Sequence, residues 1–218
     1  MKLVKFSALL LVAIVFTQCG KDAAPVSAPA MLPVDAPLIV RINDAEKFTA
    51  FSDSVSLPYV QAIDVAILNK YSNGPWTGAL VASGADKFDW IWTFKDTLGQ
   101  GGSMTENETI YSIDSLYGFK VGSTWTISKK SALLQDLLNQ RANGFSLAKD
   151  AQFSSLWNSA SKADVMNFFI QHKEIAAVGN QFFQQDWSWM THIAAWSEID
   201  LALRKNKLIG TSVSLCPD

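Results

Sequence analysis

The chain has 218 residues, of which 49% are hydrophobic and 17% charged, so it has enough apolar side chains to bury a sizeable core. Its 18 basic and 20 acidic residues give a formal net charge of −2 at pH 7. A mildly acidic chain without a basic patch has no electrostatic attraction to nucleic acid or to an anionic membrane face, and we expect no nucleic-acid partner.

The N-terminus has the pattern of a lipoprotein signal. Lys2 and Lys5 precede an apolar run over residues 8–16, and Cys19 stands at the expected cleavage point. The run is shorter than the roughly 20 apolar residues that a membrane-spanning helix needs. We therefore expect residues 1–18 to be removed and Cys19 to carry palmitate-type acyl chains, two or more of which hold a protein stably at a membrane. An ordinary cleaved signal and an uncleaved anchor are the alternatives.

Lipidation at Cys19 predicts attachment to the outer membrane, with either the periplasm or the cell surface as the side that the protein faces. The charged pair Lys21-Asp22 resembles the start of surface-exposed Bacteroidota lipoproteins, but it holds a single acid, so both faces stay open. Residues 19–33 are rich in proline and small residues and are predicted to form a flexible tether. A lipidated Cys19 would leave Cys216 without a disulfide partner in this chain.

Residues 34–150 are predicted to form a first α+β unit. A β-rich run over 38–42 is followed by a short helix that Asn43 or Asp44 can cap, and by a second helix that opens near Ser56. The next elements are strands over 78–83, 88–94, 109–113, 117–121 and 124–128, and then a leucine-rich helix that Ser128 caps and that stops at Asn143. In the second of these strands, alternation puts four aromatic residues on one face: Phe88, Trp90, Trp92 and Phe94.

The same order of elements starts again in residues 151–218. A strand over 165–171 leads into a helical segment, and a hairpin then turns at Lys205-Asn206. The fold class expected is therefore α+β, with a predominantly antiparallel sheet, helices packed on one face, and two pseudo-repeated units of which the second is incomplete. An incomplete unit would leave an open sheet edge, so we expect the natural chain to continue past Asp218. The alternative is a second unit that is simply short.

Three segments carry a resemblance to a known family: residues 33–43 (PVDAPLIVRIN), 118–128 (GFKVGSTWTIS) and 196–203 (WSEIDLAL). Together they look like a family of uncharacterised Bacteroidota lipoproteins, whose members carry repeated α+β units after a lipidated cysteine and are usually considerably longer. The resemblance implies the anchor and the repeated fold. It implies no activity, so no functional residue is carried over from it.

The sequence predicts no catalytic, cofactor-binding or metal-binding residue. His172 and Glu174 form a His-x-Glu triplet, but a metal site wants three or four convergent ligands, and we expect His172 to be a polar residue at a helix start. Glu198 and Asp200 lie on one face of a strand, about 7 Å apart, a separation that would suit an inverting glycosidase. We interpret them as the solvated outer side of that strand. The glycine-rich residues 99–102 are predicted to be a hairpin loop.

Tryptophans give the one indication of a binding surface. Trp187, Trp189 and Trp196 fall in a linker-like stretch, where exposed rings would suit contact with a protein or a glycan. The more common outcome for such residues is that they pack over the sheet as core. The sequence thus predicts a lipid-anchored envelope protein that is a non-enzymatic binding or scaffolding module. The alternative is a hydrolase of an envelope or extracellular polymer, with its site partly in a C-terminal region beyond residue 218.

Overall fold

The computed structural model describes residues 26–54, 65–72, 74–84, 87–95, 109–113, 115–183, 186–204 and 207–216. Several features predicted from the sequence lie outside these ranges: the signal segment, Cys19, the helix start near Ser56, the glycine-rich residues 99–102 and the turn at Lys205-Asn206. None of the helices within the described ranges is long and apolar enough to cross a membrane.

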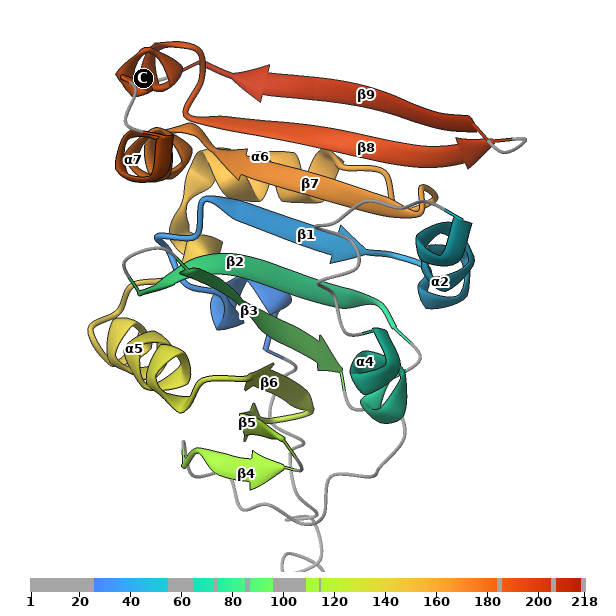
Figure 1. Cartoon of the computed structure of the whole chain (residues 1–218), viewed down its shortest axis with the longest axis vertical. Helices are drawn as coiled ribbons and strands as arrows, with labels where there is room; N and C mark the ends of the chain where they lie inside the picture. Colours follow the sequence, from blue (N-terminus) through green and yellow to red (C-terminus); the bar gives the residue numbers. More distant parts are fainter. Residues whose placement is uncertain are drawn as a thin grey trace, which may run out of the picture.

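The described strands form one nine-stranded sheet with the order β4-β5-β6-β3-β2-β1-β7-β8-β9 (Figure 1). Neighbouring strands pair antiparallel. The strands are β1 (Leu38–Ile42), β2 (Trp76–Gly84), β3 (Lys87–Lys95), β4 (Tyr111–Ile113), β5 (Leu116–Val121), β6 (Thr124–Ser128), β7 (Met166–Gln171), β8 (Trp196–Arg204) and β9 (Lys207–Leu215). The predicted α+β class with an antiparallel sheet is confirmed.

Helices and short 3₁₀ turns connect these strands. They are η1 (Ala28–Met31), α2 (Ala45–Ser54), α4 (Val65–Tyr71), α5 (Ser131–Ala142), η2 (Leu147–Lys149), α6 (Ala151–Ser159), α7 (His172–Phe183) and η3 (Ser188–His192). The predicted cap of α2 is present, because the Asp44 carboxylate accepts a hydrogen bond of 2.9 Å from the backbone N–H of Lys47. Helix α5 stops where predicted, with Asn143 as its C-cap and Gly144 following at a φ of 79° that suits glycine. Its N-cap, however, is Lys130 and not the predicted Ser128.

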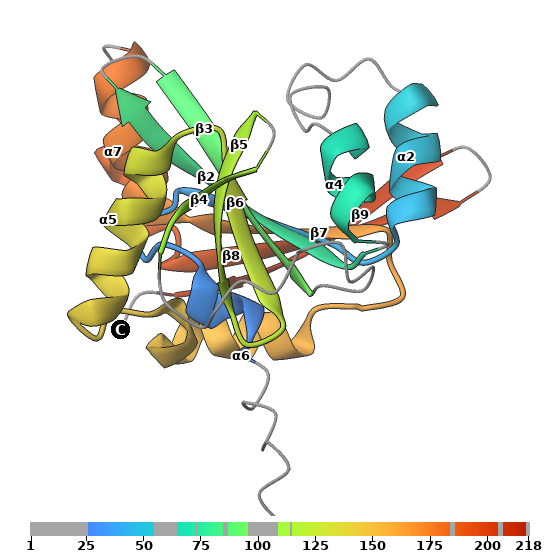
Figure 2. The same ribbon diagram turned by 90° about the horizontal axis from the view of Figure 1, so that it is seen from below.

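The helices cover both faces of the sheet, which corrects the expectation of helices on one face. Ile39 and Val40 are adjacent in β1, yet each is buried in a different core. On the face of Val40, α2 contributes Phe48, and we call this the α2 face. On the face of Ile39, α6 contributes Phe153, and we call this the α6 face. Figure 2 shows α2 and α4 on the opposite side of the sheet from α6. A central strand that is apolar on both sides needs a cover on each.

The aromatic side of β3 packs as predicted. Trp92 and Phe94 are buried on the α2 face, and Trp90 stacks on Trp92 with ring centroids 5.1 Å apart. Gly78 of β2 lies opposite Trp92, where a Cβ atom would come within 2.6 Å of the indole. A glycine at this position therefore lets the tryptophan lie flat on the neighbouring strand.

Residues 34–150 and 151–218 share one sheet and one core. β1 pairs with β7 in the middle of the sheet, and Ile39, Phe169 and Trp196 are buried in the same cluster. The predicted repetition of strand, helix and hairpin is visible on either side of this pair. The β2–β3 hairpin flanks β1, the β8–β9 hairpin flanks β7, and α2 and α7 lie at opposite ends of the sheet (Figure 1).

Two local features differ from the sequence predictions. Helix α6 was not predicted; it begins at Asp150, whose carboxylate accepts a 2.9 Å hydrogen bond from the N–H of Phe153. The second difference concerns the tether. Pro29, Met31 and Leu32 are buried, so the prediction of a flexible tether over 19–33 is wrong for this part of it. Apolar side chains spaced between the prolines pack into the α6-face core and hold the segment in place.

Candidate functional site

A row of polar side chains crosses the α6 face of the sheet. The strand register places them in line, each directly opposite the next on the neighbouring strand, and we call them the polar row: Asp200, Asn167, Arg41, Thr77, Thr93 and Thr126. Directly opposite side chains in an antiparallel sheet lie about 5 Å apart at Cβ. The row is therefore a continuous line of hydrogen-bonding groups across the sheet.

Arg41, at the centre of the row, joins the sheet to helix α6. It is 5% exposed, and its Nη1 and Nη2 donate to the carbonyls of Trp157 (2.9 Å) and Ala160 (3.0 Å) at the C-terminal end of α6. The carbonyls of a last helical turn lack partners within the helix and carry its negative pole, so a cation is stabilising there. The guanidinium also lies 4.7 Å from the centre of the Trp157 ring. Burial lowers the pKa of Arg41, while the charges of Asp200 and Glu198 act in the opposite direction.

One half of the polar row satisfies its own hydrogen bonds beneath α6. The fully buried Asn167 accepts from Arg41 Nε (2.8 Å) and Asn43 Nδ2 (2.8 Å), and it donates to the carbonyl of Ser161 (2.9 Å) and to the Asp200 carboxylate. The backbone N–H of Ser161 donates to the same carboxylate at 3.2 Å. This half therefore serves mainly to fix α6 on the sheet.

Glu198 lies on the same face as Asp200 and is only 2% exposed, so the expectation of a solvated acidic pair is wrong. Burial, together with a hydrogen bond to Asp200 and the charge of Asp200, raises the pKa of Glu198 to about 8, against the opposing charge of Arg41. Glu198 is therefore largely protonated at neutral pH.

Thr77 and Thr93, in the other half of the row, border a cavity of about 420 Å³, which we call the threonine cavity. Its lining residues are Val26, Ala28, Arg41, Asn43, Pro75, Thr77, Thr93, Phe94, Lys95, Ser123, Thr124, Trp157 and Lys162. Thr93 and its neighbour Thr126 are at most 1% exposed, and neither hydroxyl has a hydrogen-bond partner among the described residues. Buried hydroxyl groups are almost always paired. The hydroxyls of Thr93 and Thr126 therefore have unused hydrogen-bonding capacity on this side of Arg41.

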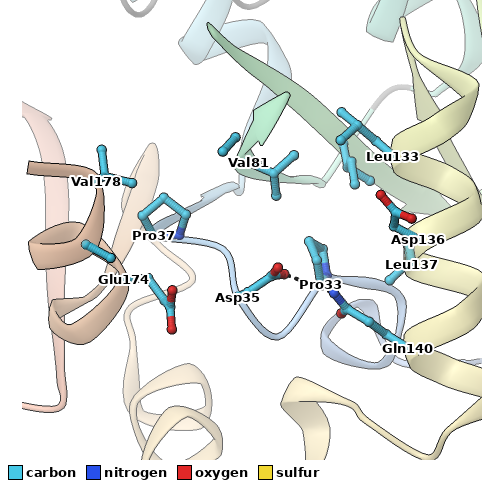
Figure 3. A pocket seen from close by; sticks show the side chains of 13 residues that line it. Pro33, Asp35, Pro37, Val81, Leu133, Asp136, Leu137, Gln140, Glu174 and Val178 are labelled. Atoms are coloured by element: carbon cyan, nitrogen blue, oxygen red, sulfur yellow. Dashed lines mark hydrogen bonds between the residues drawn. The ribbon is translucent and has the colours of Figure 1, made fainter. Parts of the chain in front are cut away.

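A smaller cavity of about 230 Å³, the acidic cavity, opens between α5 and α7 (Figure 3). Apolar side chains such as Val81 and Leu137 line it together with three carboxylates, those of Asp35, Asp136 and Glu174. Burial and the nearby charge of Asp35 raise the pKa of Glu174, while Lys173 opposes them. In the described part of the chain, no three His, Cys, Asp or Glu side chains are placed to hold a metal ion.

The segment just before β1 borders both cavities. Val26 and Ala28 line the threonine cavity, whereas Pro33, Asp35 and Pro37 line the acidic one. Hydrogen bonds fix this segment to the rest of the fold. Thr124 Oγ1 donates to the Val26 carbonyl (3.2 Å), Arg141 Nη1 to the Ala30 carbonyl (2.8 Å), and the Val34 N–H to Gln140 Oε1 (3.0 Å). Neither cavity was predicted from the sequence, and Val26, Ala28 and Pro33 were expected to belong to a flexible tether over 19–33.

The structure brings together two of the three predicted tryptophans. Trp187 stacks on Trp189 with centroids 6.4 Å apart, and Trp189 is 55% exposed. Trp187 is half-buried and lies against Gly179 of α7, where a Cβ atom would come within 2.4 Å of the ring. Trp196, in contrast, is 2% exposed, and its Nε1 donates to the Asp150 carboxylate at 3.0 Å. Trp196 is therefore a core residue and does not belong to a binding surface.

His172 begins α7, as predicted, but it is buried. Its Nε2 lies 2.7 Å from Ser197 Oγ, which in turn lies 2.7 Å from Ser214 Oγ on the edge strand β9. Burial lowers the pKa of His172, so its neutral form is favoured. This chain of polar groups is separate from both cavities, because none of its members is among their lining residues.

Comparisons with known proteins add little to this geometry. No family model matches the chain, and no curated protein is similar to it. Among solved structures, crystal form III of TP0453 aligns over 87% of this chain and 80% of its own, with 11% sequence identity and a TM-score of 0.44. A likeness at that level carries no conclusion about this chain. The resemblance to Bacteroidota lipoproteins therefore stays a prediction.

Proposed function

We propose that this chain is a lipid-anchored protein of the cell envelope whose folded part binds a small ligand without transforming it. The observation that carries the binding function is the threonine cavity. Its volume of about 420 Å³ falls in the range of small-molecule sites, roughly 300–1,000 Å³. Polar groups converge on it from β1, β2, β3 and the residues that follow α6, and the Thr93 hydroxyl beside it has no described partner.

The chemistry of this cavity favours binding over catalysis. A general acid or base must lie within hydrogen-bond reach of its substrate. The described lining residues include neither a carboxylate nor a histidine. The carboxyl pair of Glu198 and Asp200 is not among them, and Glu198 is buried under α6. No observation on the described residues specifically favours the hydrolase, which stays a prediction from the sequence.

The position of the cavity also fits an anchor at Cys19. Val26, which lines the cavity, follows Cys19 by seven positions. A fully extended chain spans at most about 3.6 Å per residue, so the cavity would lie within roughly 25 Å of the point where the lipid is attached. We propose the outer membrane as the site of attachment, through lipid on Cys19, with either face possible, and no nucleic acid among the partners.

A second contact surface is proposed at Trp187 and Trp189. The exposed ring of Trp189, stacked on the half-buried Trp187, offers apolar area that suits a protein or glycan partner. Helix α7 supports the two rings, because the Asn180 side chain accepts a hydrogen bond from the Trp187 N–H. Replacing Trp189 by alanine would weaken such a contact and leave the threonine cavity unaffected.

Fragment mapping by NMR tests the binding function. The isotope-labelled protein is screened against a mixed library of neutral, cationic and anionic fragments, and the backbone amides report where each fragment binds. We expect hits to shift the amides of Thr77, Thr93 and Thr124. The variant Thr77→Leu, which puts an apolar side chain on the cavity wall, should lose them. The matched control Thr211→Leu changes an exposed residue of β9 and should keep them. Hits that survive in Thr77→Leu, or no hits at these amides, would contradict the proposal.

Palmitate labelling tests the anchor. Cells that express the wild type, Cys19→Ala or Cys216→Ala are grown with radiolabelled palmitate, and the protein is isolated. Cys216 is an exposed free cysteine, so its variant controls for non-specific acylation of thiols. We expect label in the wild type and in Cys216→Ala and none in Cys19→Ala. Equal labelling of all three would refute the anchor.

A further inference from the structure

The two cavities on the α6 face are lined by charges of opposite sign. The acidic cavity has three carboxylates and no Lys or Arg among its lining residues. The threonine cavity has Arg41, Lys95 and Lys162 and no carboxylate. The whole chain is mildly acidic. In contrast, all the charged residues that line the threonine cavity are cations. Such a site attracts anions.

We infer that the ligand of the threonine cavity is a small hydroxylated anion, with a carboxylate or a phosphate as its charged group. This inference rests on the proposed binding function and names the ligand class of that site. The lysines supply the charge recognition, and the hydroxyls of Thr77 and Thr93 on the cavity wall supply partners for the hydroxyls of the ligand.

The three cations have different roles in this arrangement. Arg41 is buried, and its described hydrogen bonds go to Asn167 and to the last turn of α6. Lys95 and Lys162 are exposed, and neither forms an ion pair with a described carboxylate. The positive charge that an entering anion meets is therefore that of the two lysines.

The strand geometry brings the lysine charge and the hydroxyls together. Lys95 follows Thr93 by two residues in β3, so both side chains lie on the α6 face, about 7 Å apart along the strand. Lys162 follows α6 in the chain and lines the same cavity. A ligand the size of a monosaccharide spans this distance. Its anionic group can contact the lysines while its hydroxyls face the polar row. Trp157 and Pro75, which also line the cavity, offer apolar contacts.

A panel of sugars matched in shape tests the inference. Isothermal titration calorimetry measures the Kd of glucuronate, glucose 6-phosphate, glucose and glucosamine, with inorganic phosphate alone as a fifth probe. We expect glucuronate or glucose 6-phosphate to bind at least about 10-fold more tightly than glucose and glucosamine to bind most weakly. The comparison of the two anionic sugars shows whether a carboxylate or a phosphate is preferred.

Three variants locate the charge recognition. Lys95→Gln and Lys162→Gln should each weaken binding of the anionic sugar about 3- to 10-fold and reduce its dependence on salt concentration. Lys173→Gln, an exposed lysine of α7 outside the cavity, should change neither. Glucose binding should stay the same in all three.

The possible failures are distinguishable. If glucose or glucosamine binds as tightly as the anionic sugars, the anion inference is overturned while the binding function stands. If no member of the panel binds, the inference is also overturned, and the neutral and cationic fragments of the NMR screen decide the binding function. If inorganic phosphate binds as tightly as the phosphorylated sugar, the hydroxyl part of the inference is wrong.

Discussion

The buried carboxyl group of Glu198 makes the stability of the protein depend on pH in a direction opposite to ordinary acid denaturation. Glu198 has a pKa of about 8 in the folded protein, against an ordinary value of 4.5. The folded state therefore holds a proton that the unfolded state releases. This contribution to the free energy of unfolding is fully present below pH 4.5 and is lost as the pH rises through about 8.

The magnitude follows from the same shift. A group that is protonated only in the folded state costs up to about 1.4 kcal/mol of stability for each pH unit. Between pH 5 and pH 8 the loss is roughly 4 kcal/mol at most. Glu198→Gln keeps a side chain that can donate a hydrogen bond to Asp200 but cannot ionise. The variant should match the wild type in stability near pH 5 and should be more stable than the wild type at pH 8.

Urea unfolding at pH 5, 6, 7 and 8, followed by tryptophan fluorescence, measures this difference. Other groups also titrate, among them the buried His172, whose lowered pKa makes acidification destabilising below about pH 6.5. The quantity to examine is therefore the difference between variant and wild type at each pH. Glu46→Gln, an exposed residue of α2, is the control and should keep the wild-type profile. Parallel profiles for Glu198→Gln and the wild type would refute the raised pKa of Glu198.

Three other substitutions test the packing around the candidate site. Arg41→Leu leaves the carbonyls of α6 and the buried carboxylates without their cation and should cost about 3–5 kcal/mol of unfolding free energy in urea titrations; a loss below 1 kcal/mol would contradict its central role. Asp150→Ala removes the cap of α6, whose acceptor bonds the N–H of Phe153, and should cost about 1–3 kcal/mol of unfolding free energy. Asp150→Asn can still cap the helix and should recover part of that loss. Equal losses in the two variants would argue against capping. Gly179→Ala places a Cβ within 2.4 Å of the Trp187 ring and should displace the indole. We expect the maximum of tryptophan fluorescence to shift to longer wavelength, and an unchanged spectrum would contradict the contact.

Elements with local signals could be predicted from the sequence. The hairpin of β2 and β3 follows from strict alternation and a turn, and Trp92 and Phe94 lie on one face for the same reason. The end of α5 at Asn143 is a similar case. Helix α6 was missed although its signal is present, since Asp150 precedes apolar residues at helical spacing, Phe153 and Leu156.

The candidate site could not be predicted because it depends on strand register. The polar row joins residues as far apart in sequence as Arg41 and Asn167, which the pairing of β1 with β7 brings together. Nothing in either strand taken alone indicates that pairing. Glu198 was expected to be solvated for the same reason: alternation defines two faces of β8, but only the position of α6 decides which face is buried.

A titration of the isotope-labelled protein with glucuronate and with glucose 6-phosphate, followed at every assigned backbone amide, tests the proposed anion site most directly. We expect at least one of these anions to shift the amides of Thr77, Thr93 and Lys95 around the threonine cavity and to leave those of Val81 and Leu137 at the acidic cavity unchanged. Shifts at the acidic cavity, or no saturable shift at either cavity, would contradict the proposed anion site.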